Sequence, residues 1–314
     1  MKDSPPPSPG RLVLFGSADC VRDDALDAAV RGCAEVRRHA VGDDPEAELR
    51  EEAAWADLLV TFGGDGSLHL AANAVLETGA DCEIGLVPNG TGNDFARHLG
   101  TDDAAPEDAL ARVLGWPARS IDVLRVPRPA GEPRRAVNAI SFGAIAGTSA
   151  STPDAVKALA GGAAYTAWGA ARAAVVGATP VRVTGRGPDG SRFAWRGDAL
   201  GVVASNGRFT GGGFRVAPAA RLASGRFEVL ILPDLRLTQR VALSRRLRRP
   251  GGDAPDADPR AWPPRPLVAA SLTELRVESE APLPLNADGE SSEADRLEVT
   301  AEPGALRMRV PAGA

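Results

Sequence analysis

Hydrophobic and polar residues follow one pattern in the first third of the chain and another in the rest. In residues 11–115, short apolar runs alternate with segments whose apolar residues recur with a period of about 3.6. The apolar runs predict buried strands, and the periodic segments predict helices, the third of which ends at a glycine that is typical of a helix C-terminus. The predicted strands are 11–16, 57–62 and 83–88, and the predicted helices are 23–38, 46–56, 67–79 and 106–115. This alternation favours an α/β domain with a mostly parallel sheet and flanking helices.

After about residue 121 the segments become short, with alternating apolar and polar residues and turn residues between them. This pattern predicts an antiparallel, β-sandwich-like domain, interrupted by one helical segment at roughly 153–176. We therefore expect a disordered Pro-rich tail at 1–10, an α/β nucleotide-binding domain at 11–122 and a β-rich substrate domain at 123–314. Whether the last segment returns to the first domain is left open.

Composition narrows the possible functions. The chain has 314 residues and a net charge of −5, so no overall basic field points to a nucleic-acid partner. The three cysteines lack metal-ligand spacing and are expected to be free thiols of a reducing compartment. Residues 1–10 lack the apolar core of a secretory signal, and the most apolar long window is interrupted by Arg172, so we expect a cytoplasmic chain without a membrane span. The only lysines are Lys2 and Lys157, which leaves almost no place for a P-loop lysine.

Two glycine clusters each follow a predicted strand. They are "GGDGS" at 63–67 and "NGTGND" at 89–94, and both fall at the carboxyl edge of the predicted sheet, where ligands bind in such folds. Glycines there let backbone N–H groups approach an anion closely. Asp65 would then meet phosphate oxygens, which is favourable if a cation bridges them. The alternative for this cluster taken by itself is a glycine-rich turn with a capping aspartate.

The second cluster adds polar side chains to its glycines. Thr91 and Asn93 can form hydrogen bonds, and Asp94 is a candidate N-cap for the short helical segment at 95–100. Helix capping alone requires only one such residue. Two polar glycine loops at one sheet edge therefore favour a phosphate-binding site.

Several segments together resemble a known family. They are "VTFGGDGSLH", "GLVPNGTGNDFARHLG", "VNAISFGAIAG", "ASNGRFTGGGFRVAPAA" and "NADGE", which occur in this order between residues 59 and 290. This set resembles the diacylglycerol kinase catalytic-domain family, whose bacterial lipid kinases share a two-domain fold with NAD kinases.

The resemblance implies a phosphotransferase with an alcohol group as acceptor, in which ATP and Mg²⁺ serve to phosphorylate a diacylglycerol-like lipid at the membrane surface. It implies a catalytic and metal-binding role for Asp65 and places Glu290 as the general base. The residues that would line the nucleotide site are Gly63, Gly64, Gly66, Ser67, Asn89, Gly90, Thr91, Gly92, Asn93 and Asp94. The chain would be cytoplasmic and peripheral to the inner face of the membrane.

The chain departs from the family pattern at three places. The usual Asn-Pro turn after the first strand is absent from "LFGSADC". His69-Leu70 replaces an Asn-Glu pair, and for His69 we leave open either simple packing or a contact with phosphate. Ser224-Gly225 replaces an Asp-Gly that helps to hold a structural Mg²⁺, so that metal site is not expected here.

Two segments have both a structural and a membrane interpretation. The arginine-rich stretch at 239–250 is either a solvated helix face or a basic surface that meets anionic lipid headgroups, with Trp262 as an interfacial anchor or a core residue. The helix around Tyr165 and Trp168 is either core or a wall of the lipid cleft.

Two other functions remain open. One is a kinase for a soluble acceptor such as NAD or a polyol, although "GTGNDFAR" and the triple-glycine segment favour the lipid branch. The other is a catalytically degenerate protein that binds nucleotide or lipid without turnover, which the departures from the family pattern suggest.

Overall fold

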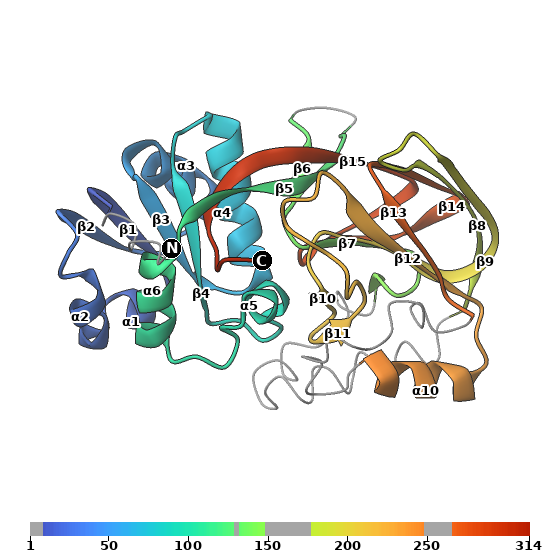
Figure 1. Cartoon of the computed structure of the whole chain (residues 1–314), viewed down its shortest axis with the longest axis horizontal. Helices are drawn as coiled ribbons and strands as arrows, with labels where there is room; N and C mark the ends of the chain where they lie inside the picture. Colours follow the sequence, from blue (N-terminus) through green and yellow to red (C-terminus); the bar gives the residue numbers. More distant parts are fainter. Residues whose placement is uncertain (1–8, 129–131, 148–176, 248–265) are drawn as a thin grey trace.

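The structure, a computed structural model, describes residues 9–128, 132–147, 177–247 and 266–314. An α/β half and a β-rich half lie side by side (Figure 1). The strands β5 and β15 run across the top of the view from one half to the other.

The α/β half is built around four strands that pair in parallel, in the order β4-β3-β1-β2. The strands β1, β3 and β4 are almost wholly buried because helices cover the sheet, which explains their unbroken apolar runs. Its elements are β1 Arg11–Gly16, α1 Ala18–Val21, η1 Asp24–Leu26, α2 Asp27–Val30, β2 Glu35–Ala40, α3 Pro45–Trp55, β3 Leu58–Gly63, α4 Asp65–Thr78, β4 Glu83–Pro88, α5 Asp94–Leu99 and α6 Pro106–Gly115.

The strand pairs within the β-rich half are antiparallel. The long strands β9 and β14 each pair with β7 along one part and with β8 along another, so they bridge these two strands. The elements are β5 Ala118–Val126, β6 Arg134–Ala136, β7 Ala139–Phe142, β8 Thr179–Arg186, β9 Arg192–Ser205, β10 Phe209–Thr210, β11 Phe214–Arg215, β12 Phe227–Pro233, α10 Leu237–Leu247, β13 Val268–Leu272, β14 Glu274–Ala287 and β15 Glu290–Arg309.

Within the described ranges, one continuous sheet of thirteen strands joins the two halves. Its link is β15, which pairs with β14 in the β-rich half and reaches β4 of the α/β half, where Met308 lies opposite Ile84. The same strand pairs with β5 over most of its C-terminal part. The sequence pattern did not predict this continuity.

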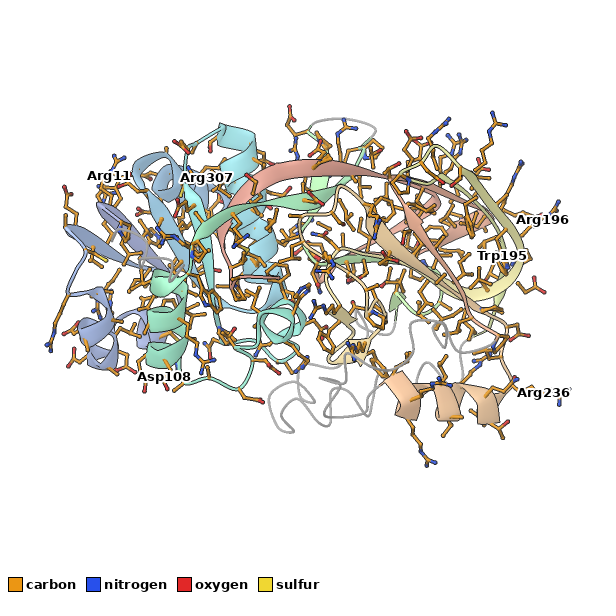
Figure 2. The ribbon with its side chains drawn as sticks, viewed as in Figure 1. Arg11, Asp108, Trp195, Arg196, Arg236 and Arg307 are labelled. Atoms are coloured by element: carbon orange, nitrogen blue, oxygen red, sulfur yellow. The ribbon has the colours of Figure 1, made fainter. Side chains whose placement is uncertain are left out.

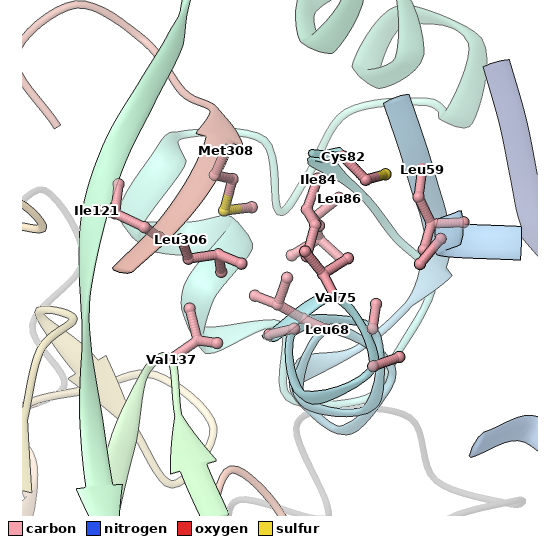
Figure 3. Packing of buried hydrophobic residues seen from close by; sticks show 14 of the residues in the cluster. Leu59, Leu68, Val75, Cys82, Ile84, Leu86, Ile121, Val137, Leu306 and Met308 are labelled. Atoms are coloured by element: carbon pink, nitrogen blue, oxygen red, sulfur yellow. The ribbon is translucent and has the colours of Figure 1, made fainter. Parts of the chain in front are cut away.

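The largest buried cluster extends across the junction of the halves (Figure 3). It packs α4 and the strands β3 and β4 against residues of β5, β15 and the segment after β6. The labelled members are Leu59, Leu68, Val75, Cys82, Ile84, Leu86, Ile121, Val137, Leu306 and Met308. Because this core contains residues from both halves, it holds the α/β half against the β-rich half.

The predicted helix at 23–38 is wrong in its second half. Residues up to Val30 form short helical turns, but β2 follows and pairs in parallel with β1 at the edge of the sheet. The polar residues of β2 are accommodated by ion pairs with α3, such as Arg37 with Glu52 at 3.4 Å. An edge strand with one polar face does not show the unbroken apolar run by which β1 and β3 are predicted.

Some expectations concern residues outside the described ranges. These are most of the tail at 1–10, the whole of the predicted helix at 153–176 with Tyr165 and Trp168, and Trp262. Among the helices that are described, none has the length and apolar character needed to cross a bilayer.

Candidate active site

The two glycine loops lie against each other at the carboxyl edge of the parallel strands. Gly63 at the end of β3 is in register with Pro88 at the end of β4, and the Asn89 backbone N–H donates to the Gly63 carbonyl at 2.9 Å. A Cβ on Gly90 would lie 2.6 Å from the Gly64 Cα, which is too close for any side chain. Glycine is therefore required here for the direct contact of the two backbones.

Asp65 ties the first loop to the second. It is the first residue of α4, and its carboxylate accepts the backbone N–H groups of Asp94 at 3.1 Å and Phe95 at 2.8 Å. Asp65 thereby caps α5 from another segment, satisfying N–H groups that lack partners within the helix. Burial raises the pKa of the Asp65 carboxyl, and the nearby Asp288 carboxylate acts in the same direction.

The structure corrects the predicted capping role of Asp94. Asn93 occupies the N-cap position of α5 with a left-handed φ of 50°, and its side-chain oxygen accepts the Gly90 N–H at 2.9 Å. Asp94 is instead the first residue of the helix. The cap that the sequence pattern assigned to a neighbouring residue is supplied by Asp65.

The Asp94 carboxylate reaches across to the triple-glycine segment of the β-rich half. It accepts the backbone N–H groups of Gly212 at 2.8 Å and Gly213 at 2.6 Å, and it pairs with Arg97 at 3.1 Å. Burial and the neighbouring Asp65 carboxylate raise the pKa of Asp94 to about 7. Asp65 and Asp94 thus connect three segments: the two glycine loops and the triple-glycine segment.

Asp288 is a buried residue of the "NADGE" turn whose importance the sequence pattern did not reveal. Its carboxylate accepts the backbone N–H groups of Val137 at 2.6 Å, Asn138 at 3.1 Å and Ala139 at 2.8 Å. His69 of α4 lies beside it, with 3.4 Å between the imidazole Nδ1 and the carboxylate. The sequence does carry one signal for Asp288, because an acidic residue stands on each side of the turn glycine Gly289, and the family resemblance points only to the second of them, Glu290.

Glu290 lies outside the cavity that Asp288 lines. Its side chain is 47% exposed and forms an ion pair with Arg134 at 3.2 Å. Of the three residues of the "DGE" turn, Asp288 and Gly289 line the cavity in the described structure, and Glu290 does not.

A cavity of about 620 Å³ extends from the glycine loops into the β-rich half. The polar end contains part of the predicted set, namely Gly64, Asp65, Gly66, Thr91, Gly92 and Asp94. The apolar end is formed by strands β9, β11 and β12 and by helix α10, through Leu200, Val203, Phe214, Leu230, Leu232, Val241, Leu243 and Leu247. One continuous space therefore joins backbone N–H groups at one end to an apolar lining at the other.

The remaining predicted residues do not line the cavity but support its loops. The Ser67 side chain folds back against Gly63, so that a Cβ on that glycine would overlap the hydroxyl. The Asn89 side-chain amide contacts the Cys20 sulfur at 2.9 Å. These residues hold the loops in shape rather than facing the cavity.

Asp122 organises the segment at which the family pattern has a structural Mg²⁺ that we do not expect in this chain. Its buried carboxylate accepts the backbone N–H groups of Ser224 at 2.8 Å, Gly225 at 2.6 Å and Gly304 at 2.9 Å. Three backbone donors thus satisfy this buried carboxylate with hydrogen bonds in the native fold.

Comparison with known proteins agrees with this arrangement. Residues 30–126 match the model of the diacylglycerol kinase catalytic domain, and residues 138–310 match the YegS C-terminal NAD kinase beta sandwich-like domain. A Stenotrophomonas maltophilia protein named "Probable lipid kinase YegS-like" is 33% identical over 82% of this chain and 80% of its own length. A Pseudomonas fluorescens protein of the same name is 33% identical over 96% of this chain and 94% of its own.

Solved structures show the same fold. A Bacillus anthracis protein described as a diacylglycerol kinase superposes with a TM-score of 0.68 at 16% identity, covering 97% of this chain and 98% of its own. A further structure from that organism gives a TM-score of 0.75 at 18% identity, with 99% of both chains covered.

The matching catalytic-domain model and the relatives show the class of protein: a phosphotransferase that has an alcohol group as acceptor. The chain belongs to the diacylglycerol kinase catalytic-domain family, and at the level of the family it is a lipid kinase.

Proposed function

We propose that this chain transfers the γ-phosphoryl group of ATP to the hydroxyl group of a diacylglycerol-like lipid. The observation that carries the proposal is the single cavity that joins the glycine loops to the apolar interior of the β-rich half. A soluble acceptor such as NAD or a polyol does not need that apolar end.

The polar end suits a polyphosphate. The first backbone N–H groups of α4 begin directly after Gly64, and a helix of 14 residues contributes a favourable dipole at that position. Gly66 and Gly92 line the same space without side chains that would block an anion. Backbone donors of this kind support phosphate binding without the P-loop lysine that the chain lacks.

For the metal, the donor set near Asp65 fits an ion that is shared with substrate. A carboxylate offers about four acceptor positions, and the two backbone N–H bonds to Asp65 use two of them. No group of three or more metal-ligating side chains occurs in the described ranges, but Mg²⁺ in kinases is usually held by one or two carboxylates together with substrate phosphates. Asp65 would hold the ion, and the bound ion would neutralise charge on the phosphates.

The number of acceptor positions left on each carboxylate also distinguishes the candidate catalytic residues. Asp288 already accepts three backbone N–H groups, and the His69 Nδ1 lies 3.4 Å from it, so at most one of its acceptor positions is left. We therefore propose a positioning role for Asp288, which fixes the segment that carries Asn138 and Ala139 in the cavity wall. Asp65 lines the cavity and retains acceptor capacity for the proposed ion, so it is the favoured catalytic residue and would act through that ion. Glu290, which the resemblance implies, would have to leave Arg134 in order to act.

The test is transfer from radiolabelled ATP with Mg²⁺ to a panel of diacylglycerol, sphingoid, prenol and soluble acceptors. We expect a labelled lipid, and we expect Asp65→Ala to lower the rate by about 10²–10⁴-fold because it removes the proposed catalytic carboxylate. Asp103→Ala removes an exposed acid near α5 and serves as the matched control. The Glu290→Gln variant tests whether Glu290 is the general base, as the resemblance implies.

Each outcome selects one interpretation. Labelling of a soluble acceptor alone would contradict the lipid proposal. ATP binding measured by calorimetry, with no transfer to any acceptor, would instead indicate the degenerate binding protein. A loss of activity in Glu290→Gln but not in Asp65→Ala would reverse the two roles.

A further inference from the structure

Helix α10 has an unusual surface for an element that forms a cavity wall. The described residues include three exposed large hydrophobic side chains, and two of them are on this helix: Leu237, which is 57% exposed, and Val241, which is 38% exposed. They are four residues apart and therefore adjoin on one side of the helix. A soluble surface normally disperses such residues.

The same helix carries concentrated positive charge. Residues 235–247 contain four arginines and no acidic residue, whereas the whole chain has a net charge of −5. Arg240 turns inward, where it contacts the Leu235 carbonyl at 2.7 Å and Asp234 at 3.3 Å. Arg236, Arg245 and Arg246 are exposed, and Figure 2 shows Arg236 beside the start of α10 at the lower edge of the β-rich half.

The exposed side of α10 meets the cavity at Val241. This residue is partly exposed and also lines the cavity, together with Leu243, Ser244 and Leu247 of the next turns. One helix thus combines an outer surface of leucine, valine and arginine with an inner surface that belongs to the apolar end of the cavity.

We propose that α10 docks the protein on an anionic lipid bilayer and forms the rim past which the acceptor lipid enters the cavity. Leucine and valine insert below the headgroups while the arginines pair with anionic phosphates, as in interfacial amphipathic helices. The entry route rests on the proposed lipid kinase function, whereas the docking itself does not.

The docking test uses the full chain without ATP, sedimented with vesicles of phosphatidylcholine alone or of phosphatidylcholine mixed with phosphatidylglycerol. We expect binding to the mixed vesicles that weakens as salt is raised. Arg245→Glu/Arg246→Glu should lower that binding by about thirtyfold or more, because each arginine near such a surface contributes about a factor of five to ten. Leu237→Ser should lower it by roughly tenfold.

Matched controls separate docking from general effects of charge and hydrophobicity. Arg22→Glu/Arg31→Glu makes the same charge change at exposed positions of the α/β half, and Val41→Ser removes the other exposed large hydrophobic side chain. Both control proteins should bind vesicles like the unchanged chain. Equal losses in the control and α10 variants, or no loss in the α10 variants, would overturn the proposal.

Two further measurements are needed. Gel filtration tests whether a second copy of the chain covers α10, and activity assays separate the docking proposal from the proposed lipid kinase function. If Leu237→Ser converts a dimer to a monomer in gel filtration, a second copy covers α10 and the docking proposal is wrong. Activity on a detergent-dispersed acceptor should survive Arg245→Glu/Arg246→Glu while activity on vesicles falls. If the chain phosphorylates no lipid but still needs α10 for vesicle binding, the proposed function fails and the docking stands.

Discussion

At the scale of single residues, the candidate site is held together by carboxylates that accept backbone N–H groups. Asp65 takes two of them from α5, Asp94 takes two from the triple-glycine segment, and Asp288 takes three from the residues around Asn138. Each bond of this kind joins segments that are distant in the sequence. The acidic residues near the cavity therefore stabilise the fold, and only a carboxylate that still has an unused acceptor position can also bind a metal ion or accept a proton.

His98 also accepts a backbone N–H group from a distant segment, and this hydrogen bond leads to a prediction about the pH dependence of stability. Its Nδ1 accepts the Arg208 backbone N–H at 3.1 Å, which requires a neutral ring, and burial followed by the Arg208 charge lowers the pKa of His98 to about 3. In the unfolded chain the ordinary pKa is about 6.5, so between these values the unfolded state binds the extra proton. Stability is therefore lost as the pH falls below about 6.5.

We expect His98→Asn to remove this dependence, because the amide oxygen can accept the same N–H group without titrating. The free energy of unfolding of the unchanged chain should fall by about 2 kcal/mol more than that of the variant between pH 7 and pH 5. Urea denaturation at the two pH values measures the difference. A constant gap between the two proteins would contradict the assignment.

At the scale of elements, the triple-glycine segment shows why glycine is needed in one loop. Gly211, Gly212 and Gly213 have φ values of 68°, 79° and 100°, a region that other residues occupy at a cost. This conformation directs two successive N–H groups at Asp94. The loop therefore helps to place α5 and, through Asp94, the second glycine loop.

Gly213→Ala should destabilise the chain by about 1–3 kcal/mol and weaken ATP binding, because the strained backbone moves the donors away from Asp94. The added Cβ would also lie 3.4 Å from the Arg97 guanidinium. Gly115→Ala, at the end of α6 and in open space outside the left-handed region, is the control and should change stability little. Thermal unfolding and calorimetric titration with ATP measure the two effects, and equal behaviour of the variants would refute the argument.

At the scale of the whole molecule, local patterns predicted the elements better than their connections. The buried strand β3 shows the expected unbroken apolar run because helices cover the sheet, and the helix ending at Gly79 shows the expected helical period because one side of it packs on the core. The edge strand β2 was missed because ion pairs satisfy its polar side. The place of Asp288 beside His69, 219 residues earlier in the chain, depends on how β15 joins the two halves, and no local pattern encodes that.

The cavity is likewise a property of the assembled halves, and its apolar end leads to a prediction about acceptor length. Leu232→Trp places a larger side chain in that end, at a partly buried position of β12 where the lining is not fully closed. Phosphorylation of a long-chain lipid should fall by about tenfold or more, which corresponds to about 1.4 kcal/mol of lost acceptor binding.

ATP binding and activity on a short-chain acceptor should persist in this variant, because the glycine loops at the polar end are unchanged. Leu283→Trp makes the same substitution at a partly buried position of β14 outside the described cavity lining, so it should leave both acceptors unaffected. Rates measured with acceptors of increasing chain length separate the cases. A short acyl chain that does not reach this end should not be affected by the tryptophan. If Leu232→Trp slows short and long acceptors equally, its effect does not depend on acyl-chain length, and the apolar end does not hold the acyl chain.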